Sequence, residues 1–420
     1  MNGEFPKVTF GAFLGPYHLP QVDANYAIHY NMEIIERLDA LGFAEAWVGE
    51  HHSGGVELIA APDIFVAAAA ERTKRIKLGL GVLSLPYHHP FQVADRIVLL
   101  DHLTRGRVIL GAGPGQLADD SKMMGINPLE NRRKMEEAFG VIYRLLHGQT
   151  ITEESDWFKL EDAFLQMKPY SDIEMACTAT VSPNGPNLAG RYGASLLSLA
   201  ATNPVGVELL ASHWDVASTI AAENGKTISR KNWRLVGIMH IAETEAQARK
   251  DCEHGLLKLL NYLSHVVPEG VQYQDYDKMV DDYNESGFTV IGTPDMAVEQ
   301  IRRLQEKSGG FGTWLSLQGD WANREATFRS YELIASAVAP HFTGATPVRE
   351  RGYQDVLTSD HRAGNITAEG QRIARQRFDK QRFDQQRSDQ QREGGLAGST
   401  TASLSPSRFA AEVASPGPGD

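Results

Sequence analysis

A carboxylic acid and two imidazoles stand together at Glu50, His51 and His52, at the end of the short apolar run 46–50. Histidine exchanges protons near neutral pH, so this trio could serve general acid and base chemistry where a strand ends. The same three residues could also form a polar rim that takes no part in a reaction. The residue types therefore indicate a candidate site and leave its use open.

Two glycine-rich segments follow later runs of apolar residues, 79–90 and 111–116. Glycine carries no side chain that would keep the backbone away from a flat ring, so both segments could pass close to a planar ligand. The second segment could be mistaken for a dinucleotide-binding fingerprint. Pro114 and the lack of the downstream glycine spacing argue against that interpretation.

An anion could bind at segment 180–185, which precedes a helix that leads to Tyr192. The first amides of a helix lack partners within the helix and favour negative charge, and Ser182 adds a hydroxyl. A phosphate group fits this end.

Short apolar runs alternate with longer segments of helical periodicity, which is typical of parallel strands joined by helices. The eight predicted strands are 8–14, 46–50, 76–83, 107–112, 174–179, 195–199, 235–241 and 313–317. Eight such pairs over some 340 residues favour an α/β fold of the (β/α)8 TIM barrel type with insertions over an open doubly wound sheet. In such a barrel the loops at the carboxyl ends of the strands build the site, and the candidate site residues described above fall in those loops.

Helices are predicted between the strands. Segment 24–41 repeats apolar residues at helical spacing on a face that should meet the barrel wall: Ile28, Met32, Ile35, Leu38 and Leu41. Segment 129–146 has the same periodicity. A further helix should begin after Thr293, with Pro294 at its first position, and run to about Lys307.

The barrel is expected to span residues 1–344. Within it, the longest irregular insertion, 267–290, carries Tyr273, Tyr276 and Tyr283 and could be a mobile lid or a plain surface excursion. Residues 345–420 form a polar tail with a five-residue repeat over 376–390. Because that period matches neither helix nor strand packing, we predict a largely disordered tail.

Composition excludes several classes of protein. The formal charge is −12 and no basic face is visible, so nucleic acid is not an expected partner. No run of 18 or more apolar residues occurs and no secretion signal opens the chain, so we expect a cytoplasmic protein with no membrane contact. Cys177 and Cys252 lack metal-ligand spacing, which favours two buried thiols and no metal.

The ordered set of strand endings resembles the bacterial-luciferase-like flavin monooxygenases, and within them the limonene-monooxygenase-like group. The resemblance spans 8–344. Its most specific pieces are Glu50-His51-His52, the segments 79–90 and 103–107, and Ile291-Gly292-Thr293-Pro294. Trp314-Leu315-Ser316-Leu317, segment 320–325 and Ala339-Pro340-His341-Phe342 resemble the close of the limonene-monooxygenase-like members.

The resemblance implies FMN, with its ring against the third and fourth strand ends and its phosphate after the fifth strand. It implies a non-prolyl cis peptide at Gly81-Val82 and acid-base catalysis by His51 with Glu50, while His52 packs or orients. The expected cofactor-binding residues are Gly81, Val82, Gly111, Ala112, Gly113, Val181 and Ser182. Two departures concern the phosphate, because Pro114 replaces an arginine of luciferase and Gly185 replaces a hydroxyl residue.

The resemblance further implies a two-component monooxygenase, in which a separate flavin reductase supplies FMNH2 and a C4a-peroxyflavin gives one oxygen atom to the substrate. The residues expected to line the substrate cavity, or else to pack the barrel end, are Phe13, Tyr17, Trp47, Tyr87 and His88. That lining suggests a small, largely apolar substrate, terpene-like or polyketide-like. Hydride transfer with a deazaflavin and a non-catalytic flavin-binding accessory protein are the alternatives. A homodimer is expected.

Overall fold

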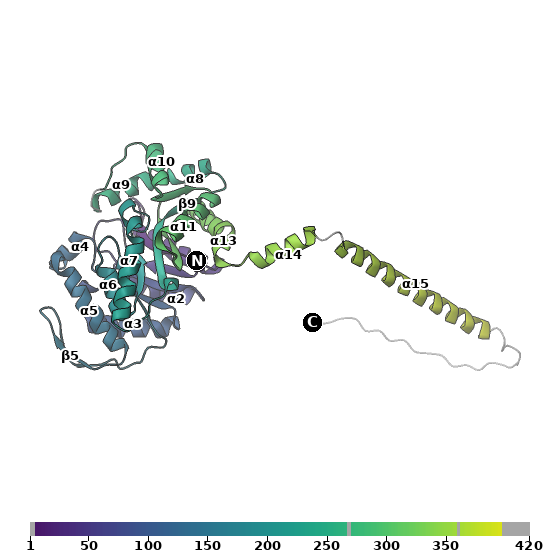
Figure 1. Cartoon of the computed structure of the whole chain (residues 1–420), viewed down its shortest axis with the longest axis horizontal. Coiled ribbons are helices and arrows are strands. Elements are labelled where there is room, and N and C mark those ends of the chain that lie inside the picture. The colour runs from purple at the N-terminus through teal and green to yellow at the C-terminus, as the bar shows by residue number, and fades with distance from the viewer. Residues whose placement is uncertain (1–4, 267–269, 359–361, 397–420) are drawn as a thin grey trace, which may run out of the picture. The chain divides into compact units, whose positions relative to one another are not determined.

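The computed structural model describes residues 5–266, 270–358 and 362–396. The chain divides into two units, Met1–Thr346 and Pro347–Asp420, and each is described by itself. Figure 1 shows the first unit as a barrel of strands inside a layer of helices.

Eight parallel strands close into the barrel, which confirms the predicted (β/α)8 fold. They follow one another in chain order, and the last pairs with the first through Thr313 beside Thr9. The strands are β1 (Thr9–Tyr17), β2 (Glu45–Val48), β3 (Lys77–Ser84), β4 (Val108–Gly113), β7 (Glu174–Ala179), β8 (Ser195–Ser198), β9 (Trp233–Ile241) and β11 (Thr313–Gly319). Each predicted strand is present, with bounds shifted by a few residues at most.

Helices on the outside of the barrel connect these strands (Figure 1). The main connecting helices are α1 (Ala24–Leu41), α2 (Pro62–Arg72), α3 (Pro90–Thr104), α5 (Asn131–Leu146), α6 (Asn184–Tyr192), α7 (Pro204–Glu223), α11 (Pro294–Ser308) and α12 (Arg324–Leu333). The predicted helix 24–41 is α1. The predicted helix 129–146 is α5, which begins two residues later than predicted. The helix predicted after Thr293 is α11, whose first turn is capped by the Thr293 hydroxyl accepting from the Met296 amide.

Helix α1 shows why the sequence folds this way. The Asp23 side chain accepts from the Tyr26 amide at its start, and Gly42, with φ of 84°, ends it in the left-handed conformation. Ile35 and Leu38 are buried as predicted. Ile28 is 36% exposed, so its predicted place against the barrel wall is wrong, and Ile34 takes a buried position instead.

The barrel interior is filled with apolar side chains. This inner cluster consists of Phe13, Trp47, Ile109, Ala176, Leu197, Val236 and Leu315. At the amino ends of the strands, the buried Arg234 guanidinium bonds the carboxylates of Glu45 and Glu174. The Trp47 indole donates to the same Glu45 at 2.8 Å, so the inner cluster is anchored to this ion-pair network.

Smaller elements interrupt the alternation. A hairpin follows α5 (β5, Ile151–Glu154; β6, Lys159–Ala163), and four short elements lie between β9 and α11: α8 (Glu245–Cys252), α9 (Leu256–Val266), α10 (Tyr276–Ser286) and β10 (Thr289–Gly292). Helices α8, α9 and α10 gather at one side of the barrel in Figure 1. The first unit also contains two short α-helices, α4 (Ala118–Met123) and α13 (Pro340–Thr343).

The prediction of an irregular insertion over 267–290 is wrong for most of its length, because α10 and β10 occupy it. Asp275 caps α10 by accepting from the Lys278 amide, and Met279 and Val280 bury one face of the helix. The Tyr276 hydroxyl donates to the Arg249 carbonyl at 2.6 Å, which fixes the helix to α8. Residues 267–269 lie outside the described part of the chain.

The second unit contains two helices, α14 (Pro347–Thr358) and α15 (Arg362–Leu396), so the prediction of a disordered tail is wrong for these residues. Their described side chains are exposed. A five-residue period gives no single buried stripe, yet glutamine, arginine and lysine are good helix formers, and pairs such as Glu369–Arg372 add support. The five-residue period therefore argues against a helix that packs one face on a core. It does not argue against a helix that is surrounded by water.

Across the described ranges, no helix has the length and apolar character that crossing a membrane requires.

Candidate functional site

Glu50 lies at the carboxyl end of β2 and joins it to the end of β3. Its buried carboxylate accepts from the Ser84 amide at 2.6 Å, from His88 Nε2 at 2.7 Å and from His52 Nε2 at 3.1 Å. Burial opposes its ionisation, but the hydrogen bonds from His52 and His88 outweigh burial and lower the pKa of Glu50 to about 2. A carboxylate that stays ionised suits an anchor for the two imidazoles better than a proton donor.

His51 lies between two carboxyl groups. Its Nδ1 is 3.2 Å from Asp120 Oδ2, and its Nε2 is 3.3 Å from Glu57 Oε2. Burial lowers the pKa of His51, and nearby acids only partly offset that effect. Burial, together with Asp120, raises the pKa of Glu57 well above its usual range. The imidazole is thus favoured in its neutral form, which can accept a proton.

Sequence reasoning missed both acids that flank His51. Asp120 lies in the short helix α4 after β4, and Glu57 lies in the loop after β2. Each follows a strand at its carboxyl end, where site residues of a barrel gather, and that position was the available signal. Which loop residues would face His51 depends on how the two loops fold, and the spacing did not show this.

His52 takes part in the network that anchors Glu50. Its amide donates to Asp120 Oδ1 at 3.1 Å, its Nε2 bonds Glu50, and its ring meets the Tyr87 ring edge-on with centroids 6.0 Å apart. The hydrogen bond with Glu50 raises the pKa of His52. The expectation that His52 packs or orients stays a prediction, and these contacts are compatible with it.

The ends of β3 and β4 form a surface that only glycine allows. The peptide bond Gly81-Val82 is cis, as the resemblance implied. A Cβ at Gly111 would lie 2.2 Å from the Leu80 carbonyl oxygen, and a Cβ at Gly113 would lie 2.4 Å from Val82 Cγ2. Ala112 between them is buried. These glycines are therefore required by the close packing of β3, β4 and Trp47, and the flavin ring expected beside them stays a prediction.

The start of α6 offers backbone groups to an anion. The side chains of Val181 and Ser182, just before it, are exposed and half-exposed, and no described side chain caps its first amides. A Cβ at Gly185 would lie 1.8 Å from the Thr178 carbonyl oxygen, so a side chain has no room there. The close approach of α6 to β7 thus explains the glycine at this position, and the free amides fit a phosphate.

The predicted substrate residues separate into two groups. Tyr17, Tyr87 and His88 lie at the mouth of the barrel, where Tyr17 packs on Trp321 with centroids 5.8 Å apart. Phe13 and Trp47 belong to the inner cluster, and Trp47 has no exposed surface. Trp47 supports the floor below Gly81 and Gly111, so its position favours packing over contact with a substrate.

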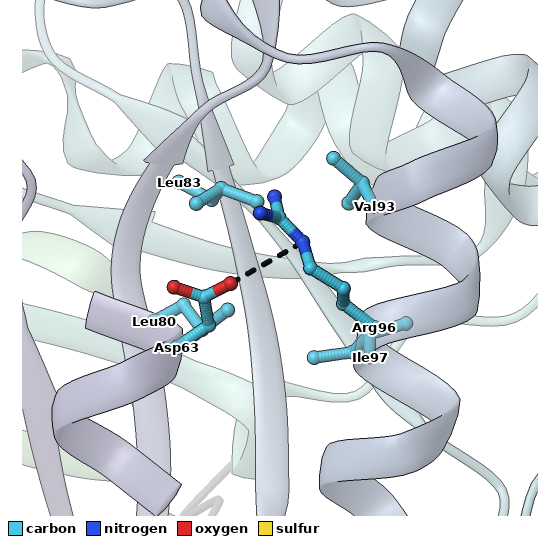
Figure 2. A pocket seen from close by; sticks show the side chains of 6 residues that line it. All are labelled: Asp63, Leu80, Leu83, Val93, Arg96 and Ile97. Carbon is cyan, nitrogen blue, oxygen red and sulfur yellow. Dashed lines mark ion pairs between the residues drawn. The ribbon is translucent and has the colours of Figure 1, made fainter. Parts of the chain in front are cut away.

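A small cavity lies outside the barrel, between α2, α3 and the outer face of β3 (Figure 2). Its lining residues are Asp63, Leu80, Leu83, Val93, Arg96 and Ile97. In Figure 2 the Arg96 and Asp63 side chains point toward each other, with Arg96 Nε 3.3 Å from Asp63 Oδ2. Arg96 also donates to His88 Nδ1 at 3.4 Å, so this cavity is linked to Glu50 through His88.

The chain has relatives among known proteins. The family model described as luciferase-like monooxygenase matches residues 8–310. Limonene 1,2-monooxygenase of Rhodococcus erythropolis is 62% identical over 90% of this chain and 97% of its own length. The 4-hydroxyprotoasukamycin monooxygenase of Streptomyces nodosus subsp. asukaensis is 43% identical over 81% of this chain and 93% of its own length.

Solved structures share the fold. The monooxygenase RslO1 from Streptomyces bottropensis superposes with a TM-score of 0.71 at 21% identity, over 80% of this chain and 100% of its own. The oxygenating constituent of 3,6-diketocamphane monooxygenase from Pseudomonas putida, solved in complex with FMN, has a TM-score of 0.65 at 23% identity, over 80% and 98% of the two chains.

Proposed function

The chain belongs to the luciferase-like monooxygenase family and is a flavin-dependent monooxygenase, and from that premise we propose its cofactor, partner and substrate class. It takes reduced FMN from a separate flavin reductase and inserts one oxygen atom from O2 into a small, largely apolar substrate of terpene-like or polyketide-like character. The observation that carries the proposal is the 62% identity to a limonene 1,2-monooxygenase over nearly its whole length.

The glycine-rich ends of β3 and β4 are the proposed place of the flavin ring. Gly81 and Val82 would lie beneath the flavin ring, with Gly111, Ala112 and Gly113 beside it. The amides at Val181 and Ser182 would meet the phosphate at the start of α6. Bound reduced FMN would supply the electrons that activate oxygen.

The protein's own side chains would hold the proton and exclude water. His51, neutral and held by Asp120, is placed to accept a proton or return one. Glu50 fixes the neighbouring imidazoles in place. Tyr17 and Tyr87 would contact the substrate above the apolar inner cluster, which keeps water from the reacting groups.

We also propose that two copies of the chain pair through α2 and α3. Ile64 on α2 and Leu99 on α3 are 71% and 50% exposed, although both are large and apolar. A second copy would cover them, since water is a poor environment for such side chains.

Binding of FMN, reduced FMN and a deazaflavin to the purified protein tests the cofactor, first without oxygen and then with oxygen admitted. We expect reduced FMN to bind and, with limonene and a reductase present, to give an oxygenated product. His51→Ala should lower turnover by about 100-fold or more, in the range of general acid-base effects. Binding of the deazaflavin alone would instead support hydride transfer, and flavin binding without turnover on any apolar substrate would support an accessory role.

A further inference from the structure

The two carboxyl groups beside His51 differ in how many hydrogen bonds they already accept. Asp120 is 1% exposed and also accepts from the His52 amide at 3.1 Å and from Ser53 Oγ at 2.5 Å. The Asp120 carboxyl oxygens act as acceptors in both of these hydrogen bonds, so we take His51 Nδ1 to carry a hydrogen and to donate to Asp120 as well. The remaining question is whether Nε2 of His51 carries a proton.

Nε2 of His51 and Oε2 of Glu57, 3.3 Å apart, need one proton between them. If the imidazole is neutral, Nε2 is an acceptor and Glu57 must be the protonated donor. If Glu57 is ionised, Nε2 must carry the proton and His51 is an imidazolium. Moving the proton from Oε2 to Nε2 breaks one O–H bond and forms one N–H bond, and the pair keeps its total charge.

The surroundings of the pair come from several elements, and all of them bear on where the proton lies. Tyr17 of β1 and Tyr262 of α9 face Glu57, Asp120 of α4 faces both partners, and Glu50 and His52 lie near His51. Tyr262 also packs over the same loop, because a Cβ at Gly54 would lie 2.3 Å from its hydroxyl. The pair is thus enclosed by side chains with little water to stabilise separate charges, and burial favours the neutral arrangement.

We propose that Glu57 is a positioning residue that shares one exchangeable proton with His51 and thereby sets whether His51 acts as a base or as an acid. With the proton on Glu57, His51 presents a free lone pair at Nε2. With the proton on His51, the imidazolium can donate it. The consequence for the reaction rests on the proposed monooxygenase function, whereas the shared proton itself is a property of the protein without cofactor.

Nitrogen NMR of the histidine side chains in the full chain without cofactor tests the shared proton directly. We expect His51 to titrate in two coupled steps, because the pair takes up one proton and then a second. Glu57→Gln keeps a hydrogen-bond donor but has no exchangeable acid, so His51 should then titrate in a single step. Glu161→Gln, at an exposed position on β6, is the matched control and should leave both steps in place.

His52 serves as an internal reference in the same spectra, because it bonds Glu50 and should keep its titration in Glu57→Gln. If the His51 titration is the same in Glu57→Gln and in the unchanged protein, Glu57 and His51 do not share a proton. A variant that loses the His52 and His88 signals as well has lost its fold. Glu57→Asp, which keeps the acid, should then be measured, and a single His51 step in that folded variant would overturn the proposal.

Steady-state kinetics with reductase, FMN and limonene give the second readout. We expect Glu57→Gln to lower kcat by about tenfold or more with little change in KM, and to remove one limb of the pH profile. Glu57→Asp should restore part of the lost kcat and part of the missing limb of the pH profile. An unchanged pH profile would overturn the role in catalysis even if the NMR result holds, and absence of any oxygenation by the unchanged protein would count against the proposed function but not against the shared proton.

Discussion

Glu50 and Glu57 are two carboxyl groups seven residues apart that the fold treats in opposite ways. Glu50 is surrounded by donors and stays ionised, whereas Glu57 is buried beside another acid and favours its protonated form. Environment, more than residue type, assigns the proton. The sequence showed an acid beside two imidazoles but could not show which acid would be ionised, because two of its donors, Ser84 and His88, come from β3 and the segment after it.

The low pKa of Glu50 makes the stability of the fold depend on pH. Its pKa falls from 4.5 to about 2 on folding, so its contribution is present above the unfolded value and is lost as pH falls from about 4.5 towards 2. That contribution is on the order of 3 kcal/mol. Glu50→Gln should therefore lower the free energy of unfolding at pH 7 but have little effect near pH 2, as measured by urea denaturation at both pH values. An equal loss of unfolding free energy at both pH values would contradict the ionic role of Glu50.

At the scale of elements, the alternation of strand and helix was predictable because buried parallel strands are short apolar runs and the outer helices have an apolar face. All eight barrel strands and the start of α11 follow from that pattern. The hairpin of β5 and β6 was missed because residues such as Glu153 and Glu161 make it polar, and α10 was missed because its capping residue, Asp275, stands among other acids.

The start of α6 is held against β7 by a contact that only glycine permits. A Cβ at Gly185 would lie 1.8 Å from the Thr178 carbonyl oxygen, so Gly185→Ala must push α6 away from the strand. We expect weaker FMN binding, by about tenfold, since backbone donors must hold their positions to bind a phosphate. Fluorescence quenching of FMN measures the affinity. Gly352→Ala, where no atom lies within 4 Å of the added carbon, is the control and should bind FMN normally.

At the scale of the whole molecule, the barrel positions loops from distant parts of the chain at the carboxyl ends of its strands. Residues of β1, β2 and β3 meet those of α4 and α9 there, and the chain order of these elements follows from the closed sheet. The sequence predicted that this end of the barrel would carry the polar and glycine-rich segments. It did not predict the partners of His51, because side chains in loops are placed by loop conformation, for which no repeating pattern exists.

Pairing of two chains through α2 and α3 is testable with a single charge. Leu99→Glu places a carboxylate on the exposed apolar face of α3 and should shift the mass in solution from dimer to monomer. Light scattering coupled to size-exclusion chromatography measures that mass. Leu129→Glu changes a leucine that is 91% exposed and lies away from both helices, so it should leave the mass unchanged. Retention of the dimer by Leu99→Glu would place the interface elsewhere.

The ion-pair network of Arg234, Glu45 and Glu174 closes the amino end of the barrel below a filled interior. A molecule that binds at the opposite end therefore cannot pass through the barrel and must arrive and leave on the side where it binds. Product must leave before fresh substrate can enter, so the two compete for the same form of the protein. As product accumulates, the apparent KM should rise while the maximal rate stays constant, and the yield of a prolonged reaction would then be limited by removal of product.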